Sequence, residues 1–260
     1  MSTLEVPGAR LYYETHGRGP LLLLITGAPG VADVYRAVTR HLAAHCAVAI
    51  YDRRGFSRSL LEGSQDYDRR LETDADDARR LIEHLGSGPA VVFGASSGAL
   101  VGLELLARHP SAIRTLIPYE PPVTRLLSDG DTWVRFFSEV YDLHRRSGPE
   151  PAMTLFRERT FAPYDHRYMA DAPRNDANAA YWFEHELRQY PSAPLDLAAL
   201  AAHAGRVTPA VGRESRGHLC YEATVALGMR LGRDVVELPG GHIGFITDAP
   251  AFAAPLVRSL

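Results

Sequence analysis

The hydrophobic residues of the chain gather in short runs that are separated by longer amphipathic or polar segments. Five runs are almost continuously apolar, which is typical of strands that helices cover on both faces. They lie at residues 21–26, 47–51, 90–93, 113–119 and 207–211, and a last strand is expected at 234–238. Two further strands, at residues 4–6 and 10–15, are predicted to form a hairpin at a sheet edge.

The segments between these runs are predicted to be helices. The clearest is residues 67–85, where Asp and Arg side chains fall on one side and apolar residues recur on the other. Others are expected at about residues 33–45, after residue 98, at 221–231 and at 250–260. Strands that alternate with helices imply an α/β fold with a mostly parallel sheet, in which ligands bind beyond the carboxyl ends of the strands.

Residues 119–190 break this alternation and are rich in aromatic side chains. They hold 13 of the chain's 23 aromatic residues, including both tryptophans, in 72 of 260 positions. We therefore predict a helical cap inserted at residues 123–203, with a core formed by residues 1–122 and 204–260. Most of the aromatics are expected to pack the cap, and a minority to form the wall of a ligand pocket. The candidates for substrate binding are Gly27, Trp133, Phe137 and Trp182.

Composition and charge narrow the range of partners. With 23% charged and 46% hydrophobic residues, the 260-residue chain is ordinary for a globular protein with one core. A net charge of −3 provides no electrostatic footprint for nucleic acid or an anionic membrane. No run approaches the roughly 18 apolar residues of a membrane span, and a signal-peptide pattern is missing, so a cytoplasmic location is expected. We expect a small-molecule substrate, no nucleic-acid or membrane partner, and allow for a homodimer.

The two cysteines, Cys46 and Cys220, stand far apart in the sequence. Their positions indicate buried thiols in a reducing compartment, without a disulfide or metal framework. No metal and no cofactor are therefore expected.

The predicted strand at residues 90–93 turns directly into a helix through Gly94-Ala95-Ser96-Ser97-Gly98. A G-x-S-x-G sequence in this setting is the nucleophile-elbow pattern, in which the central serine sits on a strained turn with its hydroxyl above the sheet. The two glycines supply room where a Cβ would clash with neighbouring chain. The following helix points its amides and positive dipole end at negative charge that forms on a bound substrate. Ser96 is therefore the candidate nucleophile.

Four segments together resemble the α/β-hydrolase fold family. They are residues 26–30, 51–59, 94–98 and 240–244, and residues 51–59 are similar to a loop of the serine-esterase and cofactor-free perhydrolase-like branch. The resemblance covers essentially the whole chain. It implies a mostly parallel twisted sheet flanked by helices, with a helical cap inserted after the strand that ends near Tyr119.

The resemblance also implies roles for single residues. Ser96 would attack a carbonyl carbon, and His242, in its Gly-rich loop, would take the serine proton as general base. The backbone amides of Ala28 and Ser97 would form the oxyanion hole. Many relatives carry His before the glycine of the first loop, whereas this chain has Thr26, so the support of that loop is expected to differ.

Two carboxylates are candidates for the acid that orients His242. After the strand that ends at Val211 the family usually places an Asp, but the corresponding residue here is Ser215, which carries no charge. Glu214 is adjacent, 28 residues before His242, and is the favoured candidate. Glu120 follows an earlier strand and is the rival, because some branches of the fold keep their acid there. A chain without a functional acid is the third interpretation.

Acyl transfer to water is the leading interpretation of these motifs. A serine at the elbow disfavours epoxide hydrolysis and dehalogenation, which in this fold use an Asp nucleophile. We expect an acyl-enzyme formed from a small or mid-sized ester, lactone or thioester with an apolar or aromatic portion. A cofactor-free lyase or cyclase is one alternative, and a member of the fold that binds a ligand without turnover is another.

Overall fold

The computed structural model describes residues 2–28, 30–86, 88–170 and 175–258. Their strands form one sheet in the order β1-β2-β4-β3-β6-β7-β8-β9, and β5 (Leu60–Leu61) pairs with β2. The parallel strands are β3 (Leu21–Ile25), β4 (Ala47–Tyr51), β6 (Ala90–Ala95), β7 (Ile113–Tyr119), β8 (Ala210–Gly212) and β9 (Val236–Leu238). The hairpin of β1 (Ser2–Val6) and β2 (Ala9–His16) is antiparallel and lies at one edge.

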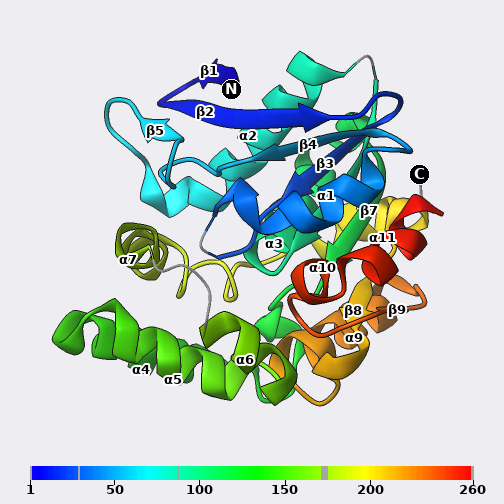
Figure 1. Cartoon of the computed structure of the whole chain (residues 1–260). Helices are drawn as coiled ribbons and strands as arrows, with labels where there is room; N and C mark the ends of the chain where they lie inside the picture. The colour runs from blue at the N-terminus through cyan, green and yellow to red at the C-terminus, as the bar shows by residue number, and fades with distance from the viewer. Residues whose placement is uncertain (1, 29, 87, 171–174, 259–260) are drawn as a thin grey trace.

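Helices cover both faces of the sheet because the side chains of each buried strand alternate between the faces. In β3, Leu22 and Leu24 belong to one apolar cluster, whereas Leu23 and Ile25 belong to another. The first cluster includes α1 (Arg36–Leu42), α10 (Gly244–Thr247) and α11 (Ala249–Val257). The second includes α2 (Arg70–Leu85), α3 (Ser97–Arg108) and α9 (Leu219–Leu231). The result is a three-layer α/β core (Figure 1).

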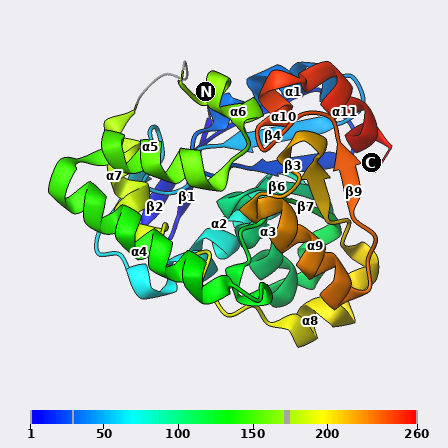
Figure 2. The same ribbon diagram turned by 90° about the horizontal axis from the view of Figure 1, so that it is seen from below.

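A third apolar cluster belongs mainly to four helices that lie between β7 and β8 in the sequence. They are α4 (Gly130–Ser147), α5 (Pro149–Thr160), α6 (Pro163–Ala170) and α7 (Asp176–His185). The buried aromatic side chains of these helices and of the link that follows α5 are Phe136, Phe137, Phe156, Phe161, Trp182 and Phe183. Figures 1 and 2 show the four helices, in green to yellow-green, gathered at one end of the sheet. We call them the cap.

Helix α8 (Leu197–Ala202) falls inside the predicted cap segment but packs with the core. It lies against α3 and α9, and Leu200 is fully buried in the cluster of those helices. The chain therefore returns to the core before the predicted boundary at residue 203, because the apolar face of α8 is covered by core helices.

The predicted α/β architecture with a mostly parallel sheet is confirmed, and the elements differ from the predictions mainly at their ends. The expected strand at 207–211 is reduced to β8, and Val207 forms only an isolated bridge to Leu116. The reason is Pro209, which has no N–H to continue the ladder. The helix expected at 33–45 begins as a 3₁₀ turn at Ala32–Tyr35, and α1 ends at Leu42. The last two residues of the helix expected at 250–260 lie outside the described residues.

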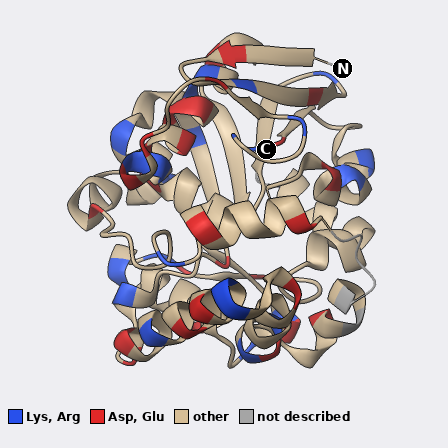
Figure 3. Ribbon diagram, turned by 90° about the vertical axis from the view of Figure 1, so that its left-hand side faces the viewer, with Lys and Arg blue, Asp and Glu red and all other residues tan. Residues whose placement is uncertain are grey.

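The structure shows how charged residues are distributed and how apolar the helices are. In the view of Figure 3, basic and acidic residues are interspersed over the core and the cap. None of the helices in the described ranges combines the length and the apolar character that crossing a membrane requires.

Gly98 offers a test of how tightly α3 is packed on the sheet. A Cβ at this position would lie 2.2 Å from the carbonyl oxygen of Ile25, whereas a Cβ at Gly205 would meet nothing within 4 Å. We expect Gly98→Ala to lower the free energy of unfolding by at least about 1–3 kcal/mol, because backbone must move to relieve the overlap. Gly205→Ala is the matched control and should unfold like the wild type. Equal urea midpoints for the two variants would contradict the packing described here.

Candidate active site

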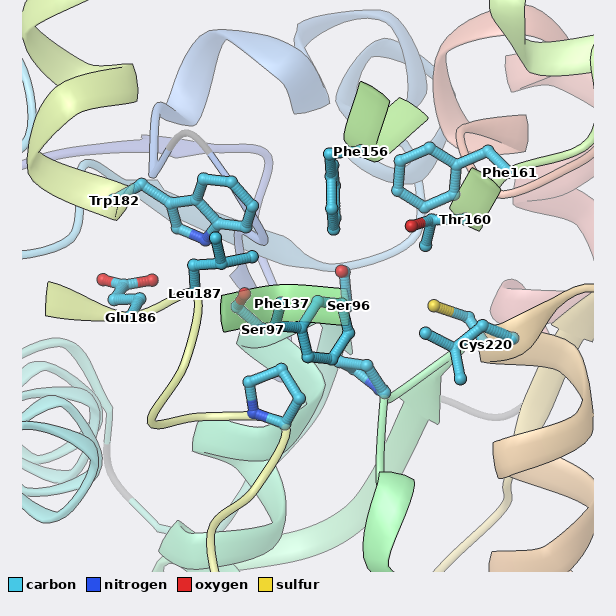
Figure 4. A pocket seen from close by; sticks show the side chains of 13 residues that line it. Ser96, Ser97, Phe137, Phe156, Thr160, Phe161, Trp182, Glu186, Leu187 and Cys220 are labelled. Carbon is cyan, nitrogen blue, oxygen red and sulfur yellow. The ribbon is translucent and has the colours of Figure 1, made fainter. Parts of the chain in front are cut away.

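Ser96 lies where β6 ends and α3 begins, in a strained backbone conformation. Its φ is 55° and its ψ is −122°, a combination that residues with a Cβ rarely adopt. The Ser96 N–H donates to the carbonyl oxygen of Tyr119 on the neighbouring strand at 2.9 Å. A Cβ at Gly94 would lie 2.3 Å from the carbonyl oxygen of Gly98, so the turn closes this tightly only with glycine at position 94. Figure 4 shows the Ser96 hydroxyl pointing into a pocket toward Phe156 and Thr160.

The loop after β3 lies directly against this turn. A Cβ at Gly27 would be 2.8 Å from the Cβ of Ser96, so only glycine allows the approach. The structure thus brings the loop of Gly27 and Ala28 beside Ser96, and the Ser97 amide stands at the first position of α3. These are the two amides that the sequence predicts as oxyanion donors.

Arg53 supports this loop, and sequence reasoning did not single it out. Its side chain is fully buried, and its Nε donates to the carbonyl oxygen of Thr26 at 2.9 Å. Its backbone N–H donates to the carbonyl oxygen of Gly30 at 2.9 Å. The guanidinium also pairs at 2.7 Å with both Asp74 of α2 and Glu186, which follows α7 of the cap. The only signal in the sequence is that Arg53 sits in the polar loop after an apolar strand.

Glu120 is the carboxylate that contacts His242. Its Oε2 lies 2.6 Å from His242 Nδ1, and its Oε1 accepts a hydrogen bond from the Gly212 N–H at 2.8 Å. Glu120 is fully buried and has a φ of 50°. The imidazole is buried and stacks on Phe161 with 4.3 Å between ring centroids. Within the described chain no hydrogen bond joins His242 to Ser96, and in unliganded enzymes such bonds are often long.

The prediction that Glu214 orients His242 is wrong in this geometry. Glu214 is exposed in the 3₁₀ turn Arg213–Ser215, and its backbone N–H donates to the carbonyl oxygen of Gly240 at 3.0 Å. The turn directs Ser215 inward and Glu214 outward. Ser215 is buried, and its hydroxyl has no hydrogen-bond partner among the described residues. A favourable sequence separation therefore did not identify the residue whose side chain reaches the histidine.

Asp165 of α6 is a second buried carboxylate near His242. Its Oδ2 accepts from the backbone N–H of His242 at 3.0 Å, and its Oδ1 accepts from that of Ile243 at 3.3 Å. Burial raises the pKa of Asp165, and the positive potential of His242 and the two amides opposes this rise. The sequence carries no signal for this contact, because Asp165 lies in a polar cap helix among other charged residues.

The pocket above Ser96 is narrow and mostly apolar. The cavity has a volume of about 20 Å³, roughly the space of one water. The residues that line it come from the elbow, the cap and the start of α9: Ser96, Ser97, Pro122, Phe137, Phe156, Thr160, Phe161, Trp182, Glu186, Leu187, Pro191, Leu219 and Cys220. Figure 4 shows the aromatic side chains of the cap roofing the serine.

The predicted substrate-binding residues are only partly brought together. Phe137 and Trp182 line the pocket. Gly27 lies beside Ser96 and outside the lining. Trp133 is also outside, which corrects the prediction: its ring packs edge-on against Phe136 with 5.8 Å between centroids. Although Trp133 and Phe137 share a face of α4, only Phe137 reaches over the elbow.

A serine elbow and a carboxylate-bound histidine, both at the cap-covered end of a parallel sheet, are the arrangement of α/β-hydrolases. The chain belongs to this family: the sequence model of the alpha/beta hydrolase fold matches residues 20–189. It is a hydrolase of that family, and the predicted family resemblance is confirmed.

Individual relatives agree with this assignment. The chain is 38% identical over 248 residues to the uncharacterized hydrolase YraK of Bacillus subtilis. The alignment covers 94% of this chain and 89% of YraK. Two solved structures share the fold with a TM-score of 0.74 each: a thermophilic esterase from Thermogutta terrifontis and an enol-lactonase from Burkholderia xenovorans. The esterase is 21% identical to this chain, and the alignment covers 100% of this chain and 99% of the esterase. The enol-lactonase is 22% identical, and the alignment covers 99% of each chain.

The raised pKa of Asp165 predicts how stability changes with pH. A carboxyl whose pKa is higher in the folded state contributes stability that is present below its ordinary pKa and is lost as pH rises through the folded value. Asp165→Asn removes this loss. The melting temperature of the variant relative to the wild type should therefore rise between about pH 4 and pH 8. Asp142→Asn, at an exposed position of the cap, is the control. A relative melting temperature that falls with pH would contradict the raised pKa.

Proposed function

We propose that this protein is a serine hydrolase that cleaves a carboxylic ester, lactone or thioester through an acyl-enzyme on Ser96. The observation that carries the proposal is the buried contact of 2.6 Å between Glu120 Oε2 and His242 Nδ1, at the same sheet end as the strained Ser96. A carboxylate at Nδ1 keeps the proton on that nitrogen, so Nε2 is left to accept one. Two structures similar to this chain are an esterase and an enol-lactonase, which supports the reaction class.

The proposed reaction begins when Ser96 Oγ bonds to the carbonyl carbon of the substrate and His242 Nε2 takes the hydroxyl proton. The carbonyl electron pair moves to oxygen, and the amides of Ala28 and Ser97 stabilise the resulting negative charge. When the carbonyl reforms, the bond to the leaving oxygen or sulfur breaks and His242 gives it the proton. A water molecule then attacks the acyl-enzyme with His242 as base, which releases the carboxylic acid and restores Ser96.

Cys220 is the thiol-bearing side chain in the pocket lining and thus a second candidate nucleophile. Burial raises the pKa of its thiol well above the ordinary range, and the negative charges of Glu120 and Asp165 raise it further. Because the thiolate is the reactive form, Cys220 stays a poor nucleophile. The nucleophile of the proposed reaction is therefore Ser96, and the apolar lining receives the acyl group.

Covalent labelling tests the nucleophile. We expect a fluorophosphonate to label the wild type and Cys220→Ser at one site, found at Ser96 by mass spectrometry, and to leave Ser96→Ala unlabelled. Ser96→Ala should also lose at least about 10³-fold in kcat/KM for p-nitrophenyl butanoate. An unlabelled wild type would count against an acyl-enzyme and favour the lyase, cyclase or binding-protein alternatives. Full turnover by Ser96→Ala would refute the assignment.

The two candidate acids can be separated by a matched pair of substitutions. In Glu120→Gln the side-chain oxygen stays on the Gly212 N–H, so the NH₂ group faces His242 Nδ1 and forces the proton onto Nε2. This is the wrong tautomer for a base, and we expect kcat to fall about 10²- to 10⁴-fold. Glu214→Gln, at the exposed position, should stay within about twofold of the wild type. A larger loss in Glu214→Gln than in Glu120→Gln would reverse the assignment.

A further inference from the structure

Two polar atoms in the wall of the pocket lack hydrogen-bond partners among the described residues: Trp182 Nε1 and Thr160 Oγ1. Trp182 is 3% exposed and Thr160 is 2% exposed, so bulk water does not satisfy them. Figure 4 shows the two side chains on either side of the Ser96 hydroxyl, with the Thr160 oxygen turned toward it. Buried polar groups are almost always paired, so an unpaired donor in a pocket indicates a ligand atom that pairs with it.

The unpaired hydroxyl of Thr160 contrasts with other threonines in helices. Thr224 donates to the carbonyl oxygen four residues earlier at 2.7 Å, and Thr73 does the same at 2.9 Å. Thr160 is the last residue of α5 and leaves the equivalent carbonyl, that of Phe156, without this bond. Its hydroxyl therefore remains available to the pocket.

The charges around the pocket restrict what the unpaired groups can bind. The lining contains no arginine or histidine, and its one carboxylate, Glu186, is held by Arg53 and Arg70 at 2.7 and 3.0 Å. An anionic group on the substrate would find neutral donors and an apolar wall but no cation, and burying it there is unfavourable. A neutral oxygen fits, because it accepts a hydrogen bond without carrying charge into the pocket.

We infer that the substrate's acyl group is short and carries a neutral hydrogen-bond-accepting oxygen, as in an alkoxy- or oxo-acyl ester, which Trp182 Nε1 and the Thr160 hydroxyl bind. This inference rests on the proposed function of Ser96. The phenylalanines of the cap contact the carbon atoms of the same acyl group. The pair of donors then selects oxygen-bearing acyl groups over hydrocarbon chains of equal length.

Three p-nitrophenyl esters of equal acyl length test this selection: the pentanoate, the ethoxyacetate and the 3-methoxypropanoate, which differ by one methylene exchanged for oxygen. Each kcat/KM is divided by the rate of the same ester with hydroxide, which removes differences in intrinsic reactivity. The wild type should prefer at least one oxygen-bearing ester about 10-fold over the pentanoate. Trp182→Phe and Thr160→Val keep shape but remove a donor, and each should reduce that preference about 3- to 10-fold, because the loss on the oxygen-bearing ester exceeds the loss on the pentanoate.

The chain offers a matched control for each variant. Trp133→Phe removes the indole nitrogen of the tryptophan outside the pocket, and Thr39→Val removes another buried, unpaired hydroxyl, in α1. Both should keep the wild-type preference. Equal corrected rates for the three esters in the wild type, or equal losses on all three in the pocket variants, would overturn the inference while the hydrolase assignment stands.

A binding measurement keeps the inference testable if turnover is absent. In the double variant Trp133→Phe, Ser96→Ala, Trp182 is the sole tryptophan, and its fluorescence reports on the pocket. The ethyl esters of the same three acids are the probes. We expect the better oxygen-bearing ester to bind about 10-fold more tightly than ethyl pentanoate. Equal binding of all three would overturn the inference, whereas failure of the proposed function shows as an unlabelled Ser96.

Discussion

The buried guanidinium of Arg53 ties together the parts of the molecule that meet at the active site. It binds the carbonyl oxygen of Thr26 in the loop beside Ser96, Asp74 of a core helix and Glu186 next to the cap. Removing one partner of such a buried pair leaves an uncompensated charge, which typically costs about 3–5 kcal/mol. The carbonyl oxygen of Thr26, in the loop beside Ser96, is therefore bound by a charged donor. The position of that loop depends on the cap being docked.

Asp165 of the cap makes a similar connection to the loop of His242. Asp165 accepts the backbone N–H groups of His242 and Ile243, so the cap contacts the histidine loop as well as the Arg53 cluster. Burial raises the pKa of Asp165, which means that its ionised form is held at a cost to stability. A hydrophobic residue would pack there without that cost, but it would leave two amides of the loop unsatisfied. The cap and the residue that follows it thus contact both the loop of His242 and the arginine that binds the loop beside Ser96.

The sequence predicts those parts of the candidate site that depend on local chain geometry. The elbow at Ser96 and the Gly-rich loop of His242 need particular residue types at fixed spacing, so both are readable, as is the alternation of strands and helices. The acid is not local: Glu120 and Glu214 both follow strands, and only the register of neighbouring strands decides which side chain points at the histidine. The prediction that Trp133 lines the pocket differs from the structure for a related reason. Helical spacing indicates which residues share a face of α4, but it does not indicate how far the pocket extends along that face.

A positive φ marks the residues whose backbone the fold holds in a strained conformation. Among the described residues, three non-glycine residues have a positive φ: Ser57, Ser96 and Glu120. Ser96 and Glu120 directly follow adjacent strands, and each donates its N–H to a carbonyl oxygen of the next strand, that of Tyr119 at 2.9 Å and that of Ala210 at 3.0 Å. Ser57 donates its N–H to Asn178 of the cap at 3.0 Å. Such conformations cost about 1–3 kcal/mol each and persist only where surrounding bonds enforce them. The sheet holds the proposed nucleophile and acid in strained positions, and the third strained residue lies where the cap meets the core.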